Sequence, residues 1–364
     1  MKKLLLIVLA LAMLLPGCTQ RSKESPEPTP APTPTPVVTP APTPTPEPTP
    51  EPTPEPTPEP IRHPLTGEAI EAELTDRPLA VMINNHEKAQ PQCGIIGADM
   101  IYEILAEGGL TRMMAIYTDH DAVERYGTMR SLRPYYLEVG LSYGALIVHA
   151  GGSDQAYSDV KTKGADNLDG VRGTNAGSYY YRDPNRTHNG LEHSLFISAE
   201  DVLTYAAERK ISVVSETPYN FGLTFVEDAV PAEGESAQNI ELTFASWKKS
   251  KFSYNADEGV YTMAQYGKHY ADGDTGDVVP FTNLLILEAP TRVLDGYGRL
   301  EVNLVGEGAG YFVNGGKYVP ITWHRDDLGQ QFYYTLADGS NLQLGIGKTY
   351  VGVVPTGDYK FIVE

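Results

Sequence analysis

Apolar runs broken by turn residues dominate the first half of the chain after residue 63. The run at 79–83 (LAVMI) predicts a buried strand that ends in a polar loop at Asn84, Asn85 and His86. Residues 98–119 contain two apolar stretches separated by Gly108 and Gly109, which favours a hairpin. A helix over residues 99–107 remains the alternative, because short apolar runs do not distinguish the two by periodicity.

The stretch 126–153 combines a helix start, a strand and a glycine-containing loop. Ser131 is a candidate helix cap, Pro134 suits a first turn, and Gly144 ends the pattern. Apolar side chains fall at helical spacing on one face: Leu132, Tyr135, Tyr136, Val139 and Tyr143. Residues 145–148 (ALIV) then predict an interior strand, residues 149–153 a loop, and residues 155–160 a short helix.

Residues 161–192 are rich in Gly, Asp, Asn, Arg and Tyr and predict a long ordered loop, which in a compact domain is usually functional or mobile. A strand at 194–198 follows. Ser198 and Asp201 then resemble a capping box for a helix that ends near Arg209.

From about residue 240 the pattern changes to alternating runs separated by turns. These runs are IELTF, KFSYN, GVYTMAQY, LLILEA, RLEVNLVG, GYFVNGGKYVPITW, QFYYTL and TYVGVV. They predict antiparallel β structure. We therefore expect an α+β protein, with a mixed α/β domain at 63–226, an acidic linker at 227–239 and a β-rich domain at 240–364.

The first 62 residues do not have the composition of a folded domain. Two lysines and an apolar run end at Gly17 and Cys18, which is the pattern of a signal peptide over residues 1–18. Residues 19–62 carry TPTP and EPTP repeats, and proline presets polyproline II, so we expect a stiff spacer on the order of 100 Å long.

The formal net charge is −19, and nearly all of it lies after residue 60. Such a surface argues against general binding to nucleic acid. It leaves room for a local cationic pocket. Cys93 is the second of two cysteines, and we expect it to be buried and unreactive.

Several motifs resemble the YerB-like lipoproteins, a family of Gram-positive envelope proteins with two domains of unknown function. They are RPLAVMINNH, PQCGIIGADMIYEILAEGGLTRMMAIY, GTMRSLRPYY, VHAGGSDQA, THNG, GGKYVPITW and GKTYVGVVP. Thr128 and Thr187 depart from the family pattern, which has proline there. The resemblance implies that Cys18 receives a diacylglyceride, which anchors the chain to the outer face of the cell membrane. It implies no known chemistry.

Polar residues gather at predicted strand ends and helix starts. The candidate ligand-binding residues are Asn84, Asn85, His86, Arg112, Arg130, Arg133, His149, Ser153, His188 and Asn189, with His193 nearby in sequence. Ligands bind beyond the carboxyl ends of strands in α/β sheets. Arg130 and Arg133 flank a helix start, where free N–H groups already favour an anion. Alternatively, they pair with Glu103, Glu107 or Glu138 and only stabilise the fold.

Other chemistries have weaker support. A Ser-His-Asp arrangement lacks the G-x-S-x-G turn. No paired-cysteine or H-E-x-x-H spacing predicts a metal, and no dinucleotide or phosphate-loop motif predicts a cofactor. Residues 272–277 (DGDTGD) match a calcium loop only in part and favour a surface turn.

Two functions remain open. The favoured one is an envelope lipoprotein whose N-terminal domain binds a partner, either a wall polymer or an envelope protein. The other is an enzyme acting on an anionic glycan or phosphodiester, with arginines holding the charge and His149 or His188 as acid and base. The two differ in whether Asn85, Arg112, Arg130, His149 and His188 converge.

Overall fold

The protein is represented by a computed structural model that describes residues 60–364. The predicted signal peptide and almost all of the predicted spacer lie outside these residues. Pro58–Glu364 forms one compact unit. Within the described range, no helix has the length and apolar character needed to cross a membrane.

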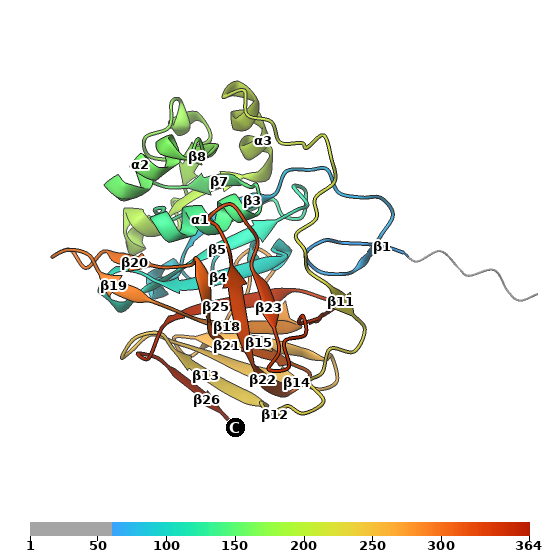
Figure 1. Ribbon diagram of the computed structural model, residues 1–364. Helices are drawn as coiled ribbons and strands as arrows, with labels where there is room; N and C mark the ends of the chain where they lie inside the picture. The colour runs from blue at the N-terminus through green and yellow to red at the C-terminus, as the bar shows by residue number, and fades with distance from the viewer. Residues whose placement is uncertain (1–59) are drawn as a thin grey trace, which may run out of the picture. The chain divides into compact units, whose positions relative to one another are not determined.

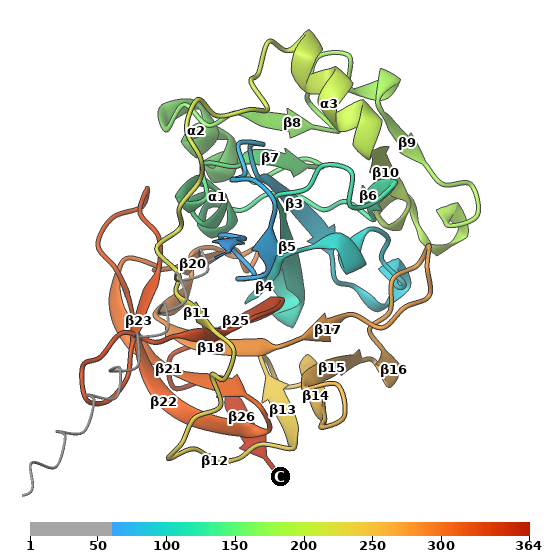
Figure 2. The same cartoon turned by 90° about the vertical axis from the view of Figure 1, so that its right-hand side faces the viewer.

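A large sheet of eleven strands runs through the unit (Figures 1 and 2). Its strands are β3 (Leu79–Asn84), β4 (Met100–Leu105), β5 (Thr111–Tyr117), β7 (Leu146–His149), β8 (Asn167–Asp169), β12 (Glu235–Ser236), β18 (Asn283–Ala289), β21 (Gly306–Asn314), β22 (Lys317–Arg325), β23 (Tyr333–Thr335) and β25 (Thr349–Pro355). The order is β12-β22-β21-β18-β25-β4-β5-β3-β7-β8, and β23 pairs with β22. Strands from both predicted domains therefore share one sheet.

The two halves of the chain meet where β25 lies between β18 and β4. Both pairings are parallel, with Thr349 opposite Met100 on one side and opposite Asn283 on the other. Parallel pairing requires crossover connections rather than tight turns. The last long strand of the chain is thus inserted beside one of the first, and neither half has a complete sheet without the other.

Smaller sheets surround this one. A six-stranded sheet contains β13 (Asn239–Thr243), β14 (Lys249–Asn255), β15 (Val260–Gln265), β16 (Lys268–His269), β17 (Pro280–Phe281) and β26 (Lys360–Val363). A three-stranded sheet contains β6 (Arg125–Gly127), β9 (Tyr180–Arg182) and β10 (Leu195–Ser198). Three pairs complete the set: β1 (Ile61–Arg62) with β2 (Ala69–Ile70), β11 (Phe225–Val226) with β24 (Leu344–Gly345), and β19 (Thr291–Val293) with β20 (Leu300–Val302).

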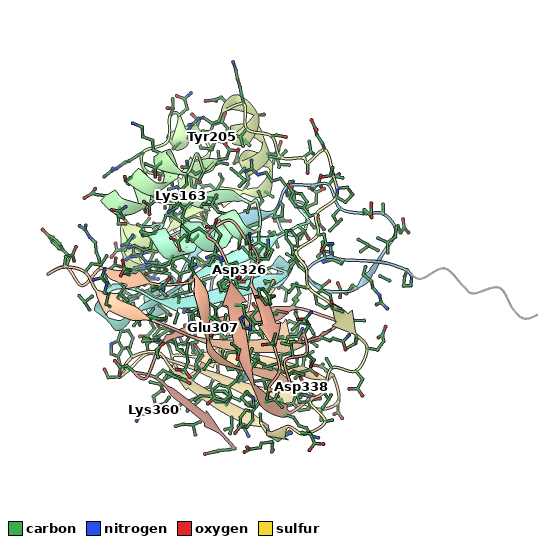
Figure 3. The ribbon with its side chains drawn as sticks, in the orientation of Figure 1. Lys163, Tyr205, Glu307, Asp326, Asp338 and Lys360 are labelled. Carbon is green, nitrogen blue, oxygen red and sulfur yellow. The ribbon has the colours of Figure 1, made fainter. Side chains whose placement is uncertain are left out.

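Three α-helices occur in the unit (Figure 1): α1 (Pro134–Ser142), α2 (Asp154–Thr162) and α3 (Ala199–Glu208). Buried residues of α1 and α2 belong to one core of the large sheet and those of α3 to the other. Short 3-10 turns occur at Glu87–Ala89, Ile95–Gly97, Glu107–Gly109, Ala176–Ser178, Thr187–Asn189 and Leu191–His193. Charged side chains spread over both ends, as Lys163 at the end of α2 and Lys360 in β26 illustrate (Figure 3).

Alternate residues of the large sheet enter two separate cores. In β3, Val81 and Ile83 join a core that includes Ile240 and Phe252 of the six-stranded sheet. Ala80 and Met82 face the opposite core, which includes the buried side of α1. Successive side chains of a strand point to opposite faces, so a strand covered on both sides reads as an unbroken apolar run.

The α+β class predicted from sequence is confirmed, as are the hairpin of β4 and β5 and the strand at β7. The alternative helix over 99–107 is wrong. Ser198 caps α3, since its Oγ accepts a hydrogen bond from the backbone N–H of Asp201 at 3.0 Å. The runs expected after residue 240 all contain strands.

Ser131 is not the cap of α1; the helix begins at Pro134, with Arg133 at its N-cap. The backbone N–H groups of Arg130 and Leu132 donate to Met82 and Gly151, so this stretch is extended and tied to neighbouring segments. A helix cannot begin where the backbone already has other partners.

Three smaller expectations also change. The long loop at 161–192 contains β8, β9 and three 3-10 turns or parts of them. Ile61 and Arg62, expected in the spacer, form β1. Glu235 and Ser236, expected in the linker, form β12 and pair with β22. Each of these segments is too short to show a periodicity of its own, and β12 depends on a partner about eighty residues away.

Candidate functional site

The segment from Thr128 to Leu132 crosses the point where β3 and β7 end. The N–H of Asn84 donates to Thr128 O at 2.8 Å, and the N–H of Arg130 donates to Met82 O at 2.9 Å. On the other side, the N–H of Ala150 donates to Arg130 O at 3.1 Å. Since β3 and β7 are parallel, Arg130 sits at their shared carboxyl edge, where open sheets bind ligands.

Two of the candidate arginines are held by a single carboxylate. Arg112 donates to Glu107 Oε2 at 2.9 Å and also bonds to Ser131 O. Arg133 bonds to Glu107 Oε1 and donates to Leu132 O at 2.8 Å. Burial opposes ionisation of Glu107, but the bond from Arg133 and the charge of Arg112 hold its pKa below the ordinary value. Of the three carboxylates that the sequence offers as partners, Glu107 is the one used.

Arg130 is different, because its guanidinium makes no hydrogen bond or ion pair with any residue of 60–364. The side chain is half-buried. Burial lowers the pKa of Arg130, and the charge of Arg133 acts in the same direction, while Glu192 and Glu107 oppose it. An arginine has five N–H donors, and no guanidinium nitrogen of Arg130 is fully buried without a partner, so these donors are accessible to a ligand. Arg130 is therefore the side chain in this region best suited to bind an anion.

Two histidines lie beside Arg130. The rings of His86 and His193 are 4.7 Å apart between centroids. Asn84 positions His193: its Nδ2 lies 3.0 Å from His193 Nδ1 and donates to Glu192 O at 2.9 Å. Burial lowers the pKa of both histidines; the charge of Arg130 lowers both further. The sequence favours His188 for this position, whereas the structure has His193 there.

Replacing Arg130 with glutamine is expected to raise the pKa of His86 and His193 toward their ordinary value. The substitution removes a positive charge that now opposes protonation of each ring. The ring C–H resonances followed by NMR as pH changes measure both pKa values. Unchanged titration curves would mean that Arg130 does not act on these rings.

The lowered pKa values of His86 and His193 also make the stability of the protein depend on pH. The pKa values of His86 and His193 are lower in the folded protein than in the unfolded chain, so at pH values between the two the unfolded chain binds more protons. The free energy of unfolding therefore rises with pH in this range and falls as the pH drops below about 6.5, the ordinary pKa of histidine. A bound anion would favour the protonated rings. We therefore expect anion affinity at this site to increase as pH is lowered across that window.

Asn85 points away from the arginines into a buried network around Glu103. Asn85 Nδ2 donates to Glu103 Oε1 at 3.0 Å, and both side chains are fully buried. Four further side chains donate to the same carboxylate: Thr111 at 2.6 Å, Tyr350 at 2.7 Å, Ser250 at 2.8 Å and Gln265 at 2.9 Å. Lys248 Nζ lies 3.5 Å from Glu103 Oε1. Asn85 is thus a structural residue that joins both halves of the chain.

His149 and Ser153 are also used by the fold. His149 is fully buried; its Nδ1 lies 2.8 Å from Gly151 O and its Nε2 3.1 Å from Asn167 Oδ1. Ser153 Oγ accepts a hydrogen bond from the N–H of Ala156 and caps α2. Neither side chain can act as an acid, base or nucleophile without giving up these bonds.

The remaining candidates do not join the arginines. His188 is exposed and Asn189 half-buried in a 3-10 turn, and within the described chain neither side chain makes a hydrogen bond. Asn85, Arg112, Arg130, His149 and His188, whose convergence separates the two functions, therefore come together only in part. Across residues 60–364, no three His, Cys, Asp or Glu side chains gather as a metal-binding group.

Cys93 is fully buried, as expected, and burial raises the pKa of its thiol to about 12 although Arg186 and Arg125 lie beside it. Its sulfur is 3.6 Å from a guanidinium nitrogen of each. The 272–277 segment is a turn in which Asp272 accepts bonds from the backbone of Asp274 and Thr275.

Sequence reasoning missed the contribution of the second half of the chain. Lys248, Ser250, Gln265 and Tyr350 reach Glu103 from positions at least 145 residues away, and no local pattern links them to it. Beside this network, Tyr266 is one of three non-glycine residues in the described chain with a positive φ, here 53°.

Comparison with known proteins identifies relatives over most of this unit. Residues 65–212 match "Protein of unknown function (DUF3048) N-terminal domain", and residues 240–351 match the corresponding C-terminal domain. The chain is 29% identical to "Putative lipoprotein YerB" of Bacillus subtilis (strain 168) over 299 residues, which are 81% of this chain and 86% of the relative. The crystal structure of YerB from Bacillus subtilis matches with a TM-score of 0.72 and 27% identity, covering 83% of this chain and 99% of that one. The chain therefore belongs to the YerB-like lipoprotein family, which is built from the two DUF3048 domains.

Proposed function

We propose that this protein is an extracytoplasmic lipoprotein that binds an anionic polymer of the cell envelope at Arg130. The predicted lipid on Cys18 holds it to the outer face of the membrane, and the predicted spacer carries the folded unit toward the wall. The supporting observation is Arg130, a half-buried residue whose guanidinium has no partner in the described chain although the protein carries a large excess of acidic residues.

The surroundings of Arg130 favour a ligand with negative charge. Arg112 and Arg133 add two guanidinium groups, and Glu107 balances only one of them. Helix α1 starts at Pro134 without a side-chain cap, so the free N–H groups of its first turn add a partial positive charge. A phosphate or carboxylate can accept bidentate hydrogen bonds from an arginine in such a place.

Binding is tested with the soluble unit, residues 58–364, and an oligomer of glycerol phosphate as the anionic probe. Saturable binding that weakens with added salt supports the proposal, because ionic contacts at a partly exposed site are screened. Absence of binding to any anionic polymer would leave a protein partner as the function of this surface.

Replacing Glu107 with glutamine is expected to strengthen anion binding. The substitution removes the carboxylate that now competes for Arg112 and Arg133, while a side chain of nearly the same shape keeps one oxygen as an acceptor. We expect several-fold higher affinity for glycerol phosphate oligomers together with lower thermal stability. Calorimetric titration and thermal unfolding measure the two effects, and weaker binding by a still-folded variant would contradict the charge argument.

An enzyme acting on an anionic glycan or phosphodiester remains the second candidate. His149 and His188 do not reach the arginines, so the acid and base it requires could come only from His86 and His193, which pair beside Arg130. The same incubation distinguishes this function, since an enzyme releases phosphate or new chain ends and a binding protein releases neither.

A further inference from the structure

A small aromatic pocket lies on the six-stranded sheet, beside Asn85 and Gly109 of the first half of the chain. It has a volume of about 310 Å³ and is lined by Trp247, Tyr266, Lys249 and Lys251 among others. Trp247 is 50% exposed, which is unusual for so large an apolar side chain in a protein whose other tryptophan, Trp323, is 1% exposed. Exposed aromatic side chains beside a pocket are typical of binding sites.

Both rings are held in place by the fold. The hydroxyl of Tyr266 donates to Asn85 O at 2.8 Å, and the ammonium of Lys248 lies 4.4 Å from the centre of its ring. The indole of Trp247 packs against Gly109, whose φ is 71° and where an added Cβ would lie 3.1 Å from the indole nitrogen. Tyr266 itself keeps a left-handed φ of 53°, which is unfavourable for an aromatic residue.

Two contacts link the pocket to segments that also carry residues near Arg130. Gly109, against which Trp247 packs, is two residues after Glu107, the partner of Arg112 and Arg133. Asn85, which accepts the Tyr266 hydrogen bond, directly precedes His86. The pocket therefore belongs to the second family domain, while the residues that border it belong to the first.

The size and chemistry of the pocket fit one sugar ring. Its volume is at the lower end of the range of small-molecule sites, about 300–1,000 Å³. Two aromatic faces can cover the apolar C–H face of a ring at little entropic cost. At the rim, Lys249 and Lys251 share the single carboxylate of Glu241, so polar groups and a net positive charge surround the aromatic surface.

We propose that Trp247 and Tyr266 bind a sugar ring of the same polymer whose negative charge is held at Arg130, so that the ligand is an anionic glycan. This inference rests on the proposed function. It adds the class of ligand and requires residues from both family domains. A polymer with charges but no sugar rings would use only the arginine part of the site.

The test compares three probes on the soluble unit: an oligomer of N-acetylglucosamine 1-phosphate, an oligogalacturonate and a glycerol phosphate oligomer without sugar rings. Trp247→Ala is expected to weaken binding of at least one sugar-containing probe by roughly tenfold and to leave the glycerol phosphate oligomer unaffected. The first two probes distinguish phosphate from carboxylate as the source of charge. Tyr297→Ala is the control, since Tyr297 is 81% exposed elsewhere on the surface.

Intrinsic fluorescence gives a second readout, because Trp323 is buried and a change on adding sugar-containing probe reports Trp247. If Trp247→Ala binds all probes as the parent does while Arg130→Gln binds none, the sugar subsite is wrong and the anion site stands. If Arg130→Gln keeps full binding of the sugar-containing probes and Trp247→Ala loses it, the anion proposal fails and a neutral sugar site remains. Binding of no probe overturns both.

Discussion

Replacing Glu103 with leucine is expected to lower the free energy of unfolding by roughly 3–5 kcal/mol. Glu103 and Lys248 are both fully buried, so the change would leave an ammonium group without a counter-charge in the core. It would also remove the acceptor of five side-chain donors. Buried donors without an acceptor are strongly unfavourable. Chemical denaturation measured by circular dichroism gives the change.

Two further variants separate the charge from the packing. The double variant Glu103→Leu/Lys248→Met is expected to recover part of the loss, since it removes the unpaired charge. Glu301→Gln, in the exposed pair of Arg292 and Glu301, is the matched control and should change stability little. If Glu103→Leu is no worse than this control, the buried network does not stabilise the fold.

The network also predicts how the protein unfolds. Glu103 lies in β4, and Lys248, Gln265 and Tyr350 come from the second half of the chain. The large sheet is continuous across the same boundary. The two family domains should therefore unfold in one cooperative transition, and the N-terminal half expressed alone should not give the native fold.

Replacing Arg130 with glutamine is expected to weaken binding of an anionic polymer by about 10- to 100-fold. A hydrogen bond to a charged group contributes about 1.5–3 kcal/mol, and about 1.4 kcal/mol corresponds to a factor of ten. The substitution should leave the fold intact, because the guanidinium has no partner within residues 60–364 to lose. Calorimetric titration with the glycerol phosphate oligomer measures the loss.

The control for this variant is Arg292→Gln, which removes the same charge from an exposed position on the β19–β20 hairpin. If binding depended only on the net charge of the protein, both substitutions would weaken it equally, because each removes one positive charge. A specific site predicts a loss for Arg130 alone and a smaller dependence on salt in what binding remains. Equal losses would show that Arg130 is not a binding residue.

A second cavity of the described chain differs in charge from the pocket at Trp247. A cavity of about 650 Å³ lies between the 226–233 segment and the loop around Asp338, which is labelled in Figure 3. Asp228, Glu233 and Asp338 are among its lining residues and make it acidic, whereas Lys249 and Lys251 line the pocket at Trp247. An anionic polymer would be repelled there, so probes of negative charge should discriminate between the two places.

Sequence by itself determined most of the longer elements of this protein. Apolar runs of strand length and their turns located the strands at β3, β4, β5 and β7, and the β-rich second half, because periodicity and turn chemistry act over a few residues. The sequence also identified the family motifs and the candidate residues Asn84, His86, Arg112 and Arg130. So was the expectation that an arginine pairs with Glu107.

Only the tertiary structure decided which of these residues face a ligand and which support the fold. It directs Asn85 and His149 inward, replaces His188 by His193 beside His86, and leaves Arg130 without a partner in the described chain. It also brings Lys248 to Glu103 and Trp247 to Gly109, from the connection between β13 and β14 of the six-stranded sheet. The physical reason is that burial and ionic partners depend on how separate segments pack, as when Asn84 meets His193 or Glu103 meets Lys248. No local pattern records those contacts.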